Sequence, residues 1–101
     1  MIIDAHQHFW NLEKVAYPWV DPAYGSICRT IEADELTPLI REASINKTVI
    51  VQAMNSYEDT EYMLKVAGER EWVGAVVGWV PFKCGTQVTK KIGRHELQKL
   101  I

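Results

Sequence analysis

Cysteine is scarce in this sequence, and long apolar runs are absent. Only two of the 101 residues are cysteines, Cys28 and Cys84, and they form neither a CxxC pair nor a dense framework. We expect both to be reduced thiols. No stretch approaches the roughly 20 apolar residues that span a bilayer, and no basic segment followed by an apolar one opens the chain. These absences predict a cytoplasmic protein without a membrane-spanning segment.

An excess of basic charge is also missing. The 11 Lys and Arg residues are outnumbered by 13 Asp and Glu, and they are mostly scattered along the chain. This balance argues against a nucleic-acid partner. The sequence also has no G-x-S-x-G, no G-x-G-x-x-G and no P-loop, and neither cysteine has a histidine nearby. Serine or cysteine nucleophiles and nucleotide-binding loops are therefore not indicated.

What is present is the composition of one small globular domain, with 48% hydrophobic and 24% charged residues. Three apolar runs have strand length, at residues 2–8, 48–53 and 73–80, and two amphipathic segments of helical period separate them, at 34–44 and 56–71. Near-continuous apolar strands alternating with helices indicate parallel βαβ units. The sequence thus predicts an α/β fold.

The connections are less regular than these elements. Residues 11–31 hold Tyr17-Pro18-Trp19 but no sustained period, so we interpret them as one long loop and a candidate wall for a site. Thr37-Pro38 is interpreted as an N-cap and first helical residue, and Ser56 as the N-cap of the second helix. Residues 86–101 fit either a strand or a helix.

His6 and His8 are the most informative pair of residues. They are two positions apart at the end of the first predicted strand, so both rings project from one face, with alpha carbons about 6–7 Å apart. Neutral imidazole suits zinc and other late divalent metals, and a catalytic site needs further ligands. Asp4 shares their parity and is a candidate to orient one ring. Alone, such a pair is also compatible with ordinary hydrogen-bonded histidines.

Several segments together resemble one family, the amidohydrolase-2 (amidohydrolase-related) group of sugar lactonases of the L-fuconolactonase and L-rhamnono-lactonase kind. The similar segments lie in family order between residues 1 and 82: Ile3-Asp4-Ala5-His6-Gln7-His8-Phe9-Trp10, Tyr17-Pro18-Trp19, Thr48-Val49-Ile50-Val51-Gln52-Ala53 and Val76-Val77-Gly78-Trp79-Val80-Pro81. The resemblance implies a (β/α)8 TIM barrel that hydrolyses sugar-acid lactones, with a divalent metal in some members.

The same resemblance implies roles for individual residues. His6 and His8 are the expected catalytic residues and metal ligands, with zinc the first candidate ion. The expected substrate-binding residues are Trp10, Gln52 and Trp79, together with Arg94 and His95, which lie in a disturbed copy of the family's G-x-R-H pattern. A sugar lactone is the expected small-molecule partner.

Length is the main departure from the family. A barrel of this type needs roughly 250 residues, whereas this chain has 101. We therefore expect one partial barrel domain over residues 1–101, divergent or rearranged from 83 onward. The isolated chain is expected to be inactive and to self-associate through exposed strand edges. The alternatives are a truncated, non-catalytic oligomer or partner-binding module, and a decarboxylase or amide hydrolase on the same fold.

Overall fold

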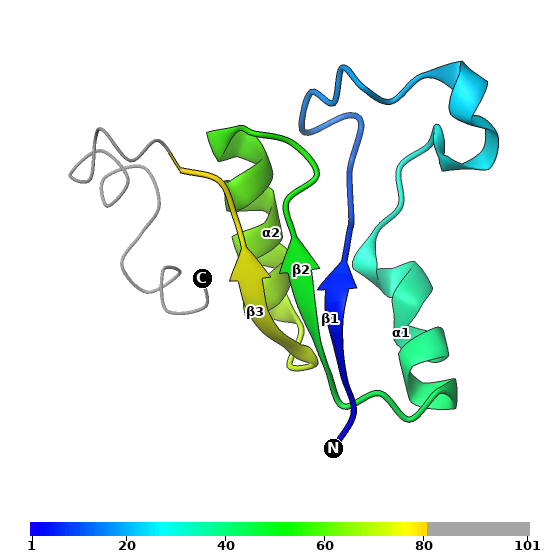
Figure 1. The fold of residues 1–101 in the computed structure, drawn as a ribbon, viewed down its shortest axis with the longest axis vertical. Helices are drawn as coiled ribbons and strands as arrows, with labels where there is room; N and C mark the ends of the chain where they lie inside the picture. Colours follow the sequence, from blue (N-terminus) through cyan, green and yellow to red (C-terminus); the bar gives the residue numbers. More distant parts are fainter. Residues whose placement is uncertain (81–101) are drawn as a thin grey trace.

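The fold is a three-stranded parallel sheet built from two βαβ units, as the sequence predicts (Figure 1). The computed structural model describes residues 1–80. The strands are β1 (Ile3–Gln7), β2 (Lys47–Val51) and β3 (Val73–Val77), in the spatial order β1-β2-β3. Helix α1 (Ala33–Glu42) connects β1 to β2, and α2 (Tyr57–Glu69) connects β2 to β3.

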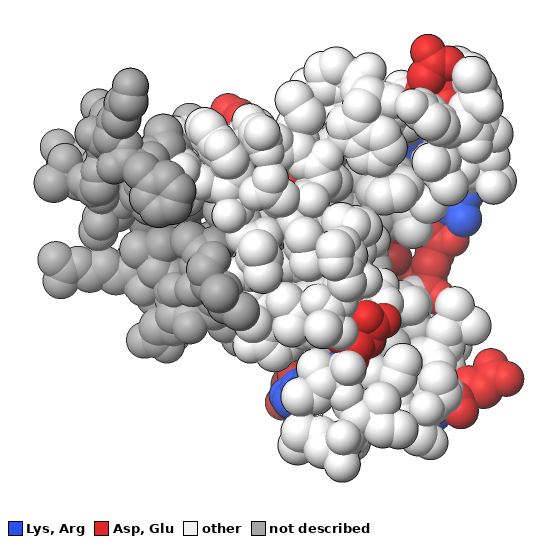
Figure 2. All heavy atoms as spheres, in the orientation of Figure 1, with Lys and Arg blue, Asp and Glu red and all other residues white. Residues whose placement is uncertain are grey.

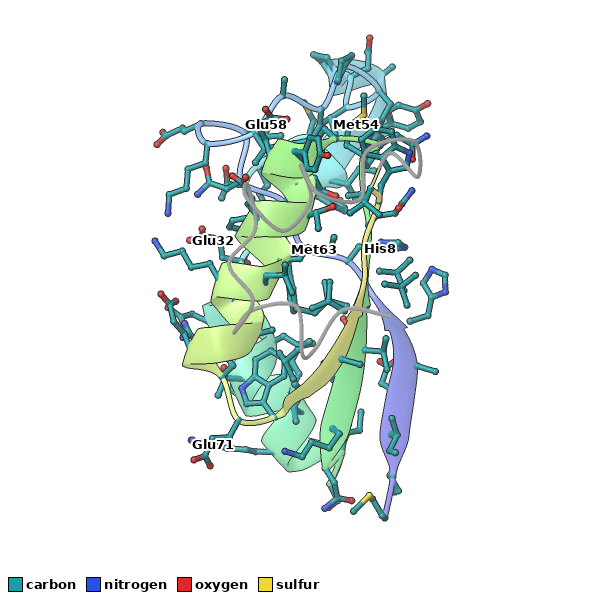
Figure 3. All side chains as sticks on the ribbon, turned by 90° about the vertical axis from the view of Figure 1, so that its left-hand side faces the viewer. His8, Glu32, Met54, Glu58, Met63 and Glu71 are labelled. Atoms are coloured by element: carbon teal, nitrogen blue, oxygen red, sulfur yellow. The ribbon has the colours of Figure 1, made fainter. Side chains whose placement is uncertain are left out.

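Helix α2 covers one face of the sheet and contributes more buried residues to the core than any other helix or strand. Its buried stripe includes Met63 and Leu64, and it faces the β-branched side chains Ile50 and Val76, which are fully buried. Figure 3 shows Met63 between the helix and the sheet. Phe9, Trp10, Val15 and Tyr17 from the connection after β1 join the same cluster. The loop segment is therefore tied into the core.

The opposite face of the sheet is apolar and uncovered among the described residues. Thr48 and Ile50 point toward α2, so Val49 and Val51 point the other way, paired with Ala75 and Val77 of β3. Figure 2 shows this face with few charged side chains at its centre and acidic groups nearer its rim. In a closed barrel, this face would line the interior.

Three details correct the sequence interpretation. The connection over residues 11–31 contains a 3-10 helix, η1 (Pro22–Ile27), and Trp10 pairs with Ile31 in an antiparallel bridge. Helix α1 begins at Ala33 with Glu32 as its N-cap, so Thr37-Pro38 does not start it. Thr37 instead donates its hydroxyl to Ala33 O at 3.1 Å, and Pro38 lies inside the helix.

The start of α2 is confirmed. The Ser56 hydroxyl accepts a hydrogen bond from Asp59 N at 3.2 Å, which satisfies one of the free amides of the first turn. The helix ends at Glu69, two residues before the predicted end. No helix among residues 1–80 is long and apolar enough to cross a membrane.

Candidate active site

The polar residues predicted as site residues lie where parallel strands end. His8 is the first residue after β1, Gln52 is the first after β2, and Trp79 is the second after β3. Because the strands are parallel, their carboxyl ends share one edge of the sheet. Figure 3 shows His8 at this edge, on the side of the sheet away from α2. Parallel α/β proteins bind their ligands at this edge.

The two histidines converge, as strand parity predicted. Their Nε2 atoms are 3.0 Å apart, and the ring centroids are separated by 4.7 Å at an interplanar angle of 74°. Both residues are exposed, so neither ring is committed to the core. The two Nε2 atoms thus face each other on exposed side chains.

A backbone carbonyl fixes the tautomer of His8. Its Nδ1 lies 3.0 Å from Val51 O at the end of β2, and a carbonyl only accepts, so this nitrogen carries the proton. In neutral His8 the Nε2 then has a free lone pair, and His6 Nε2 must donate in the bond between the rings. The neighbouring strand thus turns His8 Nε2 into an acceptor or ligand.

Asp4 does not orient either ring, which corrects the parity argument. Its carboxylate accepts hydrogen bonds from His6 N, at 3.0 Å, and from the side-chain amide of Gln7. The reason is a bulge: Asp4 pairs with Thr48 and Gln7 with Ile50, so β1 has one residue more than β2 over this span. The extra residue shifts the alternation and places Asp4 with Gln7 instead of with His6.

A hollow of about 380 Å³ opens beside His8. It is lined by His8, Trp10, Trp19, Gln52 and Ala53. Trp10 is a nearly buried wall, and its indole donates to Arg29 O at 2.7 Å. Gln52 donates to Asn55 Oδ1 at 2.5 Å, which orients its amide. Aromatic walls with a few placed polar groups are typical of small-molecule sites.

Trp79 is not among the residues that line this hollow. The backbone N–H of Trp79 donates to Thr60 Oγ1 at 3.0 Å, Thr60 donates back to Trp79 O at 2.7 Å, and the Trp79 indole stacks edge-on against Tyr57. Arg94 and His95 lie outside the described residues. Their assignment as substrate-binding residues stays a prediction.

The histidine pair fits part of a metal site. Zinc binds unprotonated imidazole nitrogens at about 2.0–2.1 Å, so two Nε2 atoms 3.0 Å apart can both reach one ion once the His6 proton moves to Nδ1. The bond from His8 Nδ1 to a carbonyl is the support that metal-bound histidines usually have. Among residues 1–80, no group of three or more His, Cys, Asp or Glu could hold a metal. The described residues therefore bring together two candidate ligands and no complete metal site.

Sequence reasoning missed the role of Asp59, which it interpreted only as an acidic residue near a helix start. Asp59 is fully buried and accepts hydrogen bonds from Tyr17 OH at 2.7 Å, Ala53 N at 2.9 Å and Met54 N at 3.1 Å. Burial, together with the bond to this carboxylate, raises the pKa of Tyr17 well above its usual value. No local pattern marks a bond that joins positions 17 and 59.

Comparison with solved structures defines the class of protein. An amidohydrolase from Burkholderia multivorans, whose crystal structure contains bound zinc, superimposes with a TM-score of 0.75 at 29% identity, over 89% of this chain and 33% of that protein. A second crystal structure of an amidohydrolase from that species, with bound HEPES, gives 0.77 at 30% identity, over 92% of this chain and 33% of that one. The three-stranded βαβ arrangement matches the N-terminal part of an amidohydrolase barrel.

Sequence comparison is more specific. An L-fucono-1,5-lactonase from Burkholderia ambifaria is 41% identical over 81 residues, which are 80% of this chain and 28% of that enzyme. Another from B. multivorans is 30% identical over 106 aligned positions, covering 95% of this chain and 36% of the enzyme. No protein-family profile matches the chain. The chain is a homologue of these amidohydrolases and lactonases, and it spans about a third of their length.

These findings confirm the resemblance found in the sequence motifs and the predicted fold class. The lactonase activity of the two relatives belongs to proteins about three times as long as this chain.

Proposed function

We propose that residues 1–80 form the first part of a barrel that hydrolyses the ring ester of a sugar-acid lactone. One observation carries this proposal: the Nε2 atoms of His6 and His8 meet at 3.0 Å beside a hollow walled by Trp10, Trp19 and Gln52. The relatives named L-fucono-1,5-lactonase supply the substrate class.

The described residues have separable tasks in this reaction. Val51 O holds His8 Nδ1–H, so that His8 Nε2 keeps its lone pair beside the hollow and accepts a hydrogen bond from His6 Nε2 until a ligand replaces it. Gln52, held by Asn55, presents an amide to substrate hydroxyls. Trp10 closes one wall against water and limits competing orientations.

We propose that His6 and His8 are also two ligands of a divalent metal, with zinc the first candidate. When bound, such an ion would polarise the lactone carbonyl and lower the pKa of a bound water. A zinc site needs three or four protein ligands, so the others must come from outside residues 1–80. Trp79, Arg94 and His95 remain proposed substrate contacts on the family resemblance alone.

A chimaeric barrel tests the proposal. Residues 1–80 would replace the matching first third of the B. multivorans L-fucono-1,5-lactonase, and acid release from L-fucono-1,5-lactone would be followed at constant pH. We expect hydrolysis well above the buffer rate. His6→Ala and His8→Ala should each reduce kcat by at least about 100-fold, since each removes a group at the reacting centre.

The matched control is Glu42→Gln, which changes an exposed residue at the end of α1. It should keep the parent rate. A folded chimaera that hydrolyses no lactone would contradict the proposal, and so would His6→Ala and His8→Ala variants as active as the parent.

A further inference from the structure

Trp19 reaches the hollow from an irregular segment, yet several contacts fix its ring. It lies between β1 and η1, outside any helix or strand, and 37% of its surface is exposed. Its indole N–H donates to Ala53 O at 2.7 Å, and its ring meets Trp10 edge-on with centroids 5.4 Å apart. The exposed part of Trp19 therefore lines the hollow, while its contacts with Ala53 and Trp10 hold the ring in place.

Asp59 forms hydrogen bonds to both chain segments that meet at the Trp19 ring. One carboxylate oxygen accepts from Tyr17 OH, two residues before Trp19. The other accepts from Ala53 N and Met54 N, in the turn whose Ala53 carbonyl binds the Trp19 indole. A single fully buried side chain thus joins the loop that carries the aromatic wall to the turn that carries Gln52. Such a buried group with three bonds has little freedom to move.

We propose that Trp19 is the specificity-determining wall of the hollow, taking the apolar C–H face of a six-membered sugar ring, and that Asp59 is the positioning residue that holds it there. This inference rests on the proposed function, because it assumes that the hollow receives a lactone. The Trp19 wall would explain why a closed sugar ring binds in preference to an open-chain sugar acid.

The chemistry of the wall supports selection by shape. An indole offers a large rigid face at little entropic cost, and it packs best on a surface that is flat and apolar. A closed sugar ring has such a face, whereas the ring-opened chain presents hydroxyls on all sides. Polar groups at His8 and Gln52 remain for the ring's carbonyl and hydroxyls. The wall thus favours the substrate over its hydrolysed product.

Binding of two probes by the 101-residue chain tests the wall. L-fucono-1,5-lactam keeps the ring and its carbonyl but resists hydrolysis, and L-fuconamide is its open-chain counterpart. By calorimetry, we expect Trp19→Ala to weaken lactam binding about tenfold and L-fuconamide binding less than about twofold. Trp19→Phe, which retains a flat ring, should restore most of the selectivity. Leu12→Ala, an exposed apolar side chain of the same connection, is the control.

Asp59 is tested by a readout that needs no ligand, the NMR signal of the Trp19 indole N–H. In Asp59→Asn the side chain loses one acceptor oxygen, so the signal should shift and exchange faster with solvent, and selectivity for the lactam should fall. Tyr17→Phe removes only the hydroxyl that bonds to Asp59, so it should shift the indole signal in the same direction by a smaller amount. This variant still tests the positioning role if Asp59→Asn does not fold. Glu71→Gln, at the far end of the sheet in Figure 3, is the carboxylate control.

The outcomes separate the two proposals. Wild-type chain that binds neither probe would overturn the wall, whereas a folded chimaera that hydrolyses no lactone would contradict the proposed function. Wild-type chain that binds the lactam, with Trp19→Ala losing affinity for both probes equally or for neither, would overturn the wall and leave the function intact. An unchanged Trp19 indole signal in folded Asp59→Asn and Tyr17→Phe would overturn the positioning role of Asp59.

Discussion

At the scale of single residues, the chemistry of the histidine pair depends on which ring nitrogen carries the proton. His8 Nδ1 donates to Val51 O, so the lone pair that matters is at Nε2. The sequence placed His6 and His8 on one face from spacing alone. The tautomer could not be predicted, because it is set by a carbonyl 43 residues away in the chain.

Tyr17 gives a residue-scale prediction about alkaline stability. Burial and the bond to Asp59 raise its pKa above the ordinary value near 10. Below pH 10 Tyr17 is protonated in both states, so its stabilisation is complete. Above that pH the unfolded chain loses the proton first, and the free energy of unfolding falls, by up to about 1.4 kcal/mol per pH unit for this group.

Urea unfolding between pH 8 and 11 measures this effect. The stability of Tyr17→Phe should fall less steeply with pH above 10 than that of the wild-type chain. Equal slopes in the two proteins would contradict the assigned pKa shift. Tyr62, whose pKa is raised by burial and by Glu32, provides a second case through Tyr62→Phe.

At the scale of elements, the end of α1 is defined by a left-handed residue. Ser44 has φ 57°, and its N–H donates to Arg41 O, while Ile45 N donates to Ile40 O. This pair of bonds is the Schellman ending, which usually has glycine at the left-handed position. No residue type indicated this ending in advance, because serine does not mark that conformation.

Ser44→Gly is therefore expected to stabilise the chain by up to about 1 kcal/mol, since glycine adopts positive φ without steric cost. Thermal unfolding checks the result. Ser26→Gly, in the exposed η1 segment, is the matched control and should be neutral or destabilising. A loss of stability in Ser44→Gly would contradict the Schellman assignment.

Strand β2 contains a second testable position. Thr48 is fully buried, and among the described residues its hydroxyl has no hydrogen-bond partner. An unpaired buried hydroxyl costs about 1–3 kcal/mol, and valine has nearly the same shape. Thr48→Val should raise the urea midpoint without changing the slope of the transition. A lower midpoint would show that the hydroxyl has a partner.

At the scale of the whole molecule, sequence periodicity predicted the order and type of every strand and α-helix between residues 1 and 80. Periodicity failed at positions where a single residue changes the local backbone structure. The β1 bulge moves Asp4 off the face of His6, and Pro38 lies inside a helix that it was expected to begin. The hollow was only partly foreseen, because Trp19 and Ala53 meet through a bond across 34 positions.

We also propose that the 101-residue chain self-associates through the β1 edge and the sheet face that residues 1–80 leave uncovered. Ile2 and Ile3 are each 54% exposed there, and exposed apolar edges template pairing with other chains. Light scattering after gel filtration should show a species larger than a monomer. Ile3→Lys should reduce its mass, whereas Leu39→Lys on α1 should not. A monomeric wild-type chain would contradict this proposal.

Titration of the 101-residue chain with Zn²⁺, followed through the imidazole nitrogens by NMR, tests most directly whether His6 and His8 act as one unit. We predict that both Nε2 signals shift together with one stoichiometry, while His8 Nδ1 keeps its proton. In His6→Ala, the response of His8 should be largely lost. Independent titration of the two rings, or an unchanged His8 response in His6→Ala, would contradict the paired site.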